Sequence, residues 1–153
     1  VHPVHLALLV ANEPVNRLMA LAGPVRNPDY PFPQDYQLIW ESESGLLTNV
    51  HVSSEAHVPH GAYLTVYGSK ETIRARNLDP YFEICKKGSE RFKRVPVGNG
   101  SLPIDLAAGI MNDFVLGKRD NFDPLPGIDE SVECIKILDA AEISIEYHTS
   151  VKP

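Results

Sequence analysis

The chain has 153 residues, of which 43% are hydrophobic and 22% charged, so its composition fits one globular domain and excludes a disordered chain or a coiled coil. Its net charge of −6 argues against nucleic acid or an anionic membrane surface as the main partner. No apolar run is long enough to cross a bilayer, and no signal-peptide pattern opens the chain, so we expect a soluble protein.

The two cysteines and the first residue indicate the setting of the chain. Cys85 and Cys134 both lie within apolar patterns, which favours free buried thiols in a reducing, cytoplasmic compartment. A disulfide between them is the alternative. The chain starts at Val1 without an initiator methionine and enters a helical pattern at once, so we expect further sequence upstream.

The first part of the chain predicts a helix, a strand and a loop. Residues 3–11 have a helical apolar pattern, which Asn12, Glu13 and Pro14 end. Residues 15–22 alternate as a strand does. Three prolines within residues 26–35 then indicate a surface loop, because proline fixes φ and removes a backbone donor.

An alternation of apolar and polar residues dominates the middle of the chain. Residues 36–41 and 46–53 alternate on either side of a turn at 42–45, which predicts an antiparallel hairpin. The same reasoning predicts further strands at 62–67, 72–76, 81–86 and 91–97. Short turns join most of these strands, as expected for an antiparallel sheet of about seven strands.

Two helices are predicted near the end. The first has Ser101 as its N-cap and Gly117 as a left-handed terminus. The second covers about 129–147, and its expected buried stripe is Val132, Ile135, Leu138, Ala141 and Ile145. Without alternation of strands and helices, the fold class is α+β, a two-layer domain with an open, mainly antiparallel sheet and helices on one face.

Helices on one face leave the other face of such a sheet in need of cover. We therefore expect a homodimer or tetramer formed through the uncovered face. The apolar residues that the pattern groups on the faces of the central hairpin are Tyr36, Leu38, Trp40, Leu46, Val50 and Val52.

The sequence contains none of the loops that bind nucleotide phosphates. Neither G-x-G-x-x-G nor G-x-x-x-x-G-K-[ST] occurs, and residues 98–100 (GNG) are a linker turn. We therefore expect no dinucleotide to be held by this chain alone.

The histidines are the main candidate functional residues. Two pairs, His2/His5 and His57/His60, have a spacing of three residues. These pairs suggest a metal-dependent hydrolase as one hypothesis. A zinc site needs three or four ligands, however, so the alternative is that they are surface histidines without a metal. His2 lies in the first turn of a helix, where it could project into a cleft and accept a proton. An exposed residue at a fraying helix end is the alternative, and the residue pattern alone favours it.

Several segments resemble one family when their order is considered. The opening helix with His2 and Leu6 is followed by Glu13-Pro14-Val15 and by the hairpin that contains Trp40. Three later segments complete the pattern: 66–73 (VYGSKETI), 113–119 (DFVLGKR) and 127–132 (GIDESV), the last running into Asp139-Ala140-Ala141. Together they resemble the C-terminal domain of the glucose-fructose oxidoreductase / inositol dehydrogenase / MocA (Gfo/Idh/MocA) family, over essentially the whole chain.

The resemblance implies an NAD(P)-dependent oxidoreductase of sugars, cyclitols or related polyols. An N-terminal Rossmann domain outside this chain would bind NAD or NADP. Residues 1–153 would be a single C-terminal domain that supplies one wall of the substrate cleft and a subunit interface, and that is inactive alone. The alternative is a non-catalytic module for binding, regulation or self-association with the same fold.

The resemblance also implies roles for the histidines. His2 matches the histidine of the family's Asp-x-x-x-His motif, which works on the substrate hydroxyl as acid and base, and the aspartate would lie just upstream of Val1. His5 stands where the family often has aspartate, which is a departure from the pattern. His5, His57 and His60 are the candidate substrate contacts, and no residue is expected to bind cofactor or metal.

Overall fold

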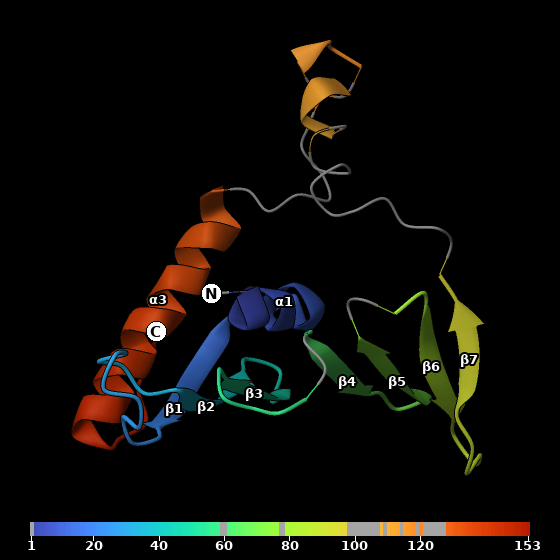
Figure 1. Cartoon of the computed structure of the whole chain (residues 1–153). Coiled ribbons are helices and arrows are strands. Elements are labelled where there is room, and N and C mark those ends of the chain that lie inside the picture. Colours follow the sequence, from blue (N-terminus) through green and yellow to red (C-terminus); the bar gives the residue numbers. More distant parts are fainter. Residues whose placement is uncertain are drawn as a thin grey trace. The chain divides into compact units, whose positions relative to one another are not determined.

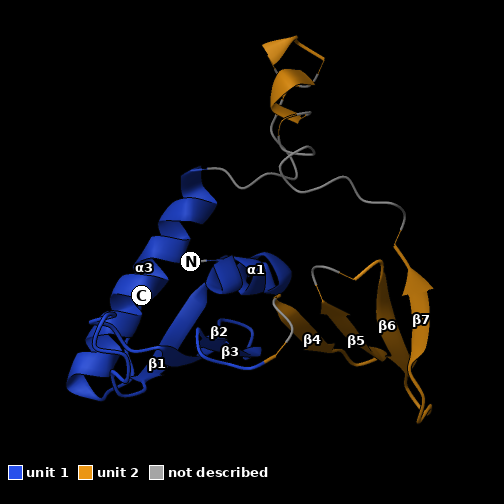
Figure 2. Cartoon of the chain, viewed as in Figure 1, with its two compact units in different colours: residues 1–57, 126–153 blue, residues 58–125 orange. Residues whose placement is uncertain are grey.

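The computed structural model describes residues 2–58, 61–76, 79–97, 108, 110–113, 115–118, 120 and 128–153. The chain forms two compact units, coloured separately in Figure 2. Unit 1 consists of residues 1–57 and 126–153, and unit 2 of residues 58–125. Each unit contains its own sheet, so each is described by itself.

The elements of both units are labelled in Figure 1. Unit 1 contains α1 (His2–Ala11), β1 (Val15–Ala22), β2 (Asp35–Ser42), β3 (Leu47–Ser53) and α3 (Ile128–Tyr147). Unit 2 contains β4 (Tyr63–Tyr67), β5 (Glu71–Arg76), β6 (Tyr81–Lys86) and β7 (Lys93–Pro96). All strand pairs are antiparallel and follow chain order, which confirms the α+β class. The expectation of one sheet of about seven strands was wrong, because the strands divide between a three-stranded and a four-stranded sheet.

The core of unit 1 lies between its sheet and its helices. Trp40 pairs with Leu18 of β1, and Leu38 pairs with Ala20 of β1 and Val50 of β3. These side chains point to the same face of the sheet, and each is at most 5% exposed. Burying one large apolar side chain of this kind stabilises the fold by about 1.5–3 kcal/mol.

Helix α3 packs on this face through small residues. Its buried residues are Cys134, Ile137, Ala140, Ala141 and Ser144. The predicted buried stripe was therefore wrong at Val132 and Ile135, which are 45% and 51% exposed. The physical reason is that alanine and serine let a helix approach the sheet closely, whereas the periodicity rule favours the larger residues.

Ser144 links α3 to the free edge of β1. Its Oγ accepts a hydrogen bond from the Ala20 N–H at 2.9 Å and donates to the Thr149 carbonyl at 2.5 Å. Two residues earlier on β1, the Leu18 N–H donates to the Val151 carbonyl, and the Val151 N–H donates to the Leu18 carbonyl, both at 2.8 Å. An edge strand normally exposes such groups, so these bonds close the outer edge of β1.

The other face of the unit 1 sheet is open. We call this surface the open face. Its exposed apolar residues are Met19 (45% exposed), Leu21 (52%), Ile39 (48%) and Leu47 (71%). Leu38, Trp40 and Val50, which the sequence analysis grouped with the predicted interface, lie instead in the core beneath the helices. The pattern separates the two faces of a strand but does not say which face the helices cover.

Unit 2 has a four-stranded sheet without a fully buried strand residue. On one of its faces, guanidinium groups lie over aromatic rings: Arg74 over Phe92 at 4.0 Å and Arg94 over Tyr81 at 4.4 Å. Gly117 has a φ of +65°, as predicted for a helix end, whereas its predicted N-cap Ser101 lies outside the described residues.

Neither Cys85 nor Cys134 forms a disulfide, as their sequence pattern favoured, but the expected burial was wrong at Cys85. Cys85 is partly exposed, and Cys134 is 2% exposed in the core between α3 and the sheet. Burial raises the pKa of the Cys134 thiol, because the thiolate would lose its hydration.

The replacement Ser144→Ala should lower the free energy of unfolding by about 1–3 kcal/mol, since it leaves the Ala20 N–H and the Thr149 carbonyl without their partner. Urea denaturation followed by circular dichroism measures the change. Ser150→Ala, at an exposed serine, is the matched control and should have little effect. Equal midpoints for both variants would contradict the role given to Ser144.

The raised pKa of Cys134 predicts a loss of stability in alkali. Above a pH of about 8.5 the thiol ionises in the unfolded chain while it stays protonated in the folded one. The folded state then binds more protons, so the free energy of unfolding falls as the pH rises. The stability difference between the parent and Cys134→Ala should therefore narrow between pH 7 and pH 10; a constant difference would exclude this effect.

Candidate functional site

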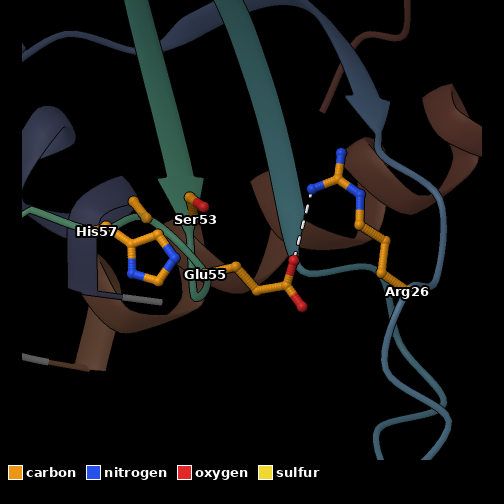
Figure 3. A pocket seen from close by; sticks show the side chains of 5 residues that line it. Arg26, Ser53, Glu55 and His57 are labelled. Carbon is orange, nitrogen blue, oxygen red and sulfur yellow. Dashed lines mark hydrogen bonds and ion pairs between the residues drawn. The ribbon is translucent and has the colours of Figure 1, made fainter.

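An open pocket lies in unit 1 where β3 ends. Arg26, Ser53, Glu55, Ala56 and His57 line it, and its volume is about 690 Å³. Figure 3 shows Arg26 and Glu55 facing each other across the pocket, with Ser53 and His57 on the side of β3. The lining therefore offers a guanidinium, a carboxylate, a hydroxyl and an imidazole.

Arg26 is held between two carboxylates. Its Nη1 lies 3.0 Å from Asp35 Oδ2 and 3.5 Å from Glu55 Oε2. Its backbone N–H donates at 2.9 Å to the side-chain oxygen of Gln34, which is only 6% exposed. The proline loop is thus fixed at both ends, and one cation faces two anions. Exposed pairs of this kind add little stability, but their polar atoms can exchange hydrogen bonds with ligand hydroxyl groups.

The pocket contains one of the four predicted site histidines. His57 is exposed on its wall, and His60 lies outside the described residues. His2 is exposed at the first position of α1. Helix α1 packs against β3, and His57 follows the end of β3 by four residues, so both histidines belong to unit 1.

His5 follows one turn after His2 and is only partly exposed. Its Nε2 is buried and has no hydrogen-bond partner among the described residues. The buried Nε1 of Trp40 and Oγ of Ser42 share this condition. The Nε2 atom of His5 is thus shielded from solvent, whereas His2 is exposed.

Sequence reasoning did not identify Arg26, Ser53 or Glu55 as site residues. A usable signal was present. β1 and β3 both pair antiparallel with β2 and so run in the same direction. The residues that follow β1 and β3 must therefore meet at one end of the sheet, which brings Arg26 and Glu55 together.

The described residues contain no group of three His, Cys, Asp or Glu side chains that could hold a metal ion. Among the described residues, the glycines that follow strands are Gly23, Gly45, Gly68 and Gly88, and none of them begins a helix that could receive a pyrophosphate. In the part of the chain that the structure describes, no helix has the length and apolar character of a membrane span.

Comparison with known proteins adds evidence at the level of the fold. No family model and no curated protein matches the sequence. Among solved structures, the chain resembles the aldose-aldose oxidoreductase of Caulobacter crescentus, solved with glycerol. That match has a TM-score of 0.82 at 13% identity and covers 99% of this chain and 45% of that protein.

Two further oxidoreductases show the same likeness. An inositol dehydrogenase homolog of Azotobacter vinelandii, solved with NADH and myo-inositol, matches with a TM-score of 0.78 at 16% identity, over 99% of this chain and 48% of that one. An oxidoreductase of Pseudomonas syringae matches with a TM-score of 0.79 at 19% identity, over 99% and 50%.

These matches define the class of fold. The chain has an α+β fold like that of a C-terminal-type domain of oxidoreductases. The oxidoreductases with this fold include the inositol dehydrogenase homolog and the aldose-aldose oxidoreductase named above. It spans about half the length of the solved proteins that it matches. This is the fold that the Gfo/Idh/MocA resemblance implied.

Proposed function

We propose that the chain is the substrate-binding and oligomerising part of an NAD(P)-dependent oxidoreductase of a sugar, cyclitol or polyol. The observation that supports this most is a likeness of fold over 99% of the chain to about half of each solved oxidoreductase. NAD or NADP would be bound mainly by a Rossmann domain outside residues 1–153. The cofactor would accept the hydride from the carbon that carries the reacting hydroxyl.

His2 is the proposed acid/base residue of this reaction. Oxidation of an alcohol releases the hydroxyl proton as the hydride leaves, so a nearby base has to take that proton. His2 is exposed at the start of α1, where its imidazole is free to meet a substrate. In the reverse direction the protonated ring would return the proton to the carbonyl oxygen.

His5, His57 and His60 are the proposed substrate contacts, and the pocket adds Arg26 and Glu55 to them. Arg26 can donate hydrogen bonds to hydroxyl oxygens, and Glu55 can accept from hydroxyl protons. Such an arrangement suits a ligand with several adjacent hydroxyl groups.

The open face of the unit 1 sheet is the proposed subunit interface of a homodimer or tetramer. Met19 and Ile39 are cross-strand partners, and Leu21 lies two residues along β1 from Met19 on the same face. A self-complementary apolar patch on a sheet is the usual basis of a two-fold contact.

The replacement His2→Ala, made in the full-length protein, should lower kcat by about 10²–10⁴-fold with polyols and NAD or NADP, because the proton acceptor is lost. Nicotinamide absorbance follows the reaction. His51→Ala, an exposed histidine on β3, is the control and should keep its activity. Full activity of His2→Ala would remove this residue from the mechanism.

The replacement Ile39→Lys should convert the oligomer to monomers at micromolar concentration, because a buried unpaired ammonium is costly. Light scattering measures the mass. Ile143→Lys on α3 is matched in exposure, 46% against 48%, and should leave the oligomer intact. A parent chain that is already monomeric would contradict the proposed interface.

A non-catalytic module is the second candidate. His5 favours it, because this residue departs from the aspartate that the family often has, and its Nε2 is buried without a described partner. Such a module would self-associate through the open face but would show no nicotinamide-dependent turnover in the full-length protein.

A further inference from the structure

Helix α3 carries a second apolar stripe on the side opposite the sheet. We call this the outer stripe: Ile128, Val132, Ile135 and Ile143, which are 82%, 45%, 51% and 46% exposed. Their spacings of about one, one and two helical turns align them along the helix. Single exposed apolar side chains are normally scattered over a protein surface. Branched apolar side chains that gather on one exposed face of a helix are instead typical of a docking surface.

Acidic side chains accompany the outer stripe. The acidic residues of α3 are Asp129, Glu130, Glu133, Asp139, Glu142 and Glu146. Its one basic residue, Lys136, bonds to Glu133 at 2.6 Å. Asp139 lies four residues from both Ile135 and Ile143 and so falls between them on the same side of the helix, with Glu142 and Glu146 beside it. The exposed side of the helix therefore combines branched apolar side chains with carboxylates.

The acids of the second half of α3 oppose the helix itself. Glu142 and Glu146 lie near the C-terminus, where the helix dipole is negative, and the last turn holds no basic residue. Glu142 also follows Asp139 by three residues and precedes Glu146 by four, so like charges are neighbours on the surface. This arrangement costs stability, and a cationic partner would remove the cost.

We propose that the outer stripe is a docking surface for a basic amphipathic helix of a partner protein. The apolar residues of that helix would pack along Ile135 and Ile143, and its lysine or arginine residues would pair with Glu142 and Glu146. A second copy of α3 does not fit, because it would set the same acids against each other. The redox role proposed above uses none of these residues, so this inference is independent of it.

A synthetic helix tests the proposal with the chain of 153 residues. The probe is a labelled peptide as long as α3, 20 residues, with leucine on one face and lysine on the other. A peptide of the same composition in scrambled order, which has no apolar face, is the control. Fluorescence anisotropy should show saturable binding of the amphipathic peptide, weakened at about 0.5 M salt, and no saturable binding of the scrambled one.

Substitutions in the outer stripe should act on this binding alone. Ile135→Ser should weaken it by about tenfold or more, because an apolar contact is lost. Val97→Ser, at a residue of unit 2 that is 50% exposed against 51% for Ile135, is the matched control and should keep the affinity. Binding that persists in Ile135→Ser, or that is equal for both peptides, would overturn the proposal.

The double replacement Glu142→Gln and Glu146→Gln separates docking from a structural role. It should weaken the binding of the amphipathic peptide. It should also raise the urea midpoint of the chain, since the repulsion between the carboxylates along α3 disappears. A fall in both quantities, or unchanged affinity, would contradict the proposal. Two further results would contradict the proposal. One is that the amphipathic peptide does not bind, which would mean that another part of the same chain covers the outer stripe. The other is that the chain self-associates and that Ile135→Ser abolishes this self-association.

Discussion

The close contact between α3 and β1 is the constraint on which unit 1 depends. Small side chains at Ala140 and Ala141 bring the helix down onto the sheet, and Ser144 then reaches the Ala20 N–H at the edge of β1. The chain end continues the same function through the pairing of Val151 with Leu18. A strand that would otherwise expose its hydrogen-bonding edge is therefore closed by residues more than a hundred positions away in sequence.

This contact also determines which face of the sheet is buried as core and which face is exposed. With α3 and α1 on one face, Leu38, Trp40 and Val50 become core, and Met19 and Ile39 are left exposed. Helix α1, whose first residue is His2, lies on the covered face, because its Val4 belongs to the same core. The proposed catalytic residue and the proposed subunit interface are thereby assigned to different surfaces of unit 1.

Much of this fold could be predicted from the sequence, because period-two alternation and turn residues are local signals. Each predicted strand is present, and the left-handed Gly117 was placed correctly. The pattern failed where packing decided the outcome: Val132 and Ile135 lie outside because smaller neighbours face the sheet. The pocket was missed because Arg26 and Glu55 meet only through strand direction, and His60 lies outside the described residues.

The oxidoreductase proposal and the docking proposal both start from this layered unit, so its central contact is the part to measure first. Amide hydrogen exchange reports it residue by residue. The account predicts that the Ala20 and Leu18 amides exchange as slowly as the amides of β1 that pair with β2, since Ser144 and Val151 close that edge. Exchange at Ala20 and Leu18 as fast as at an exposed strand edge would contradict it.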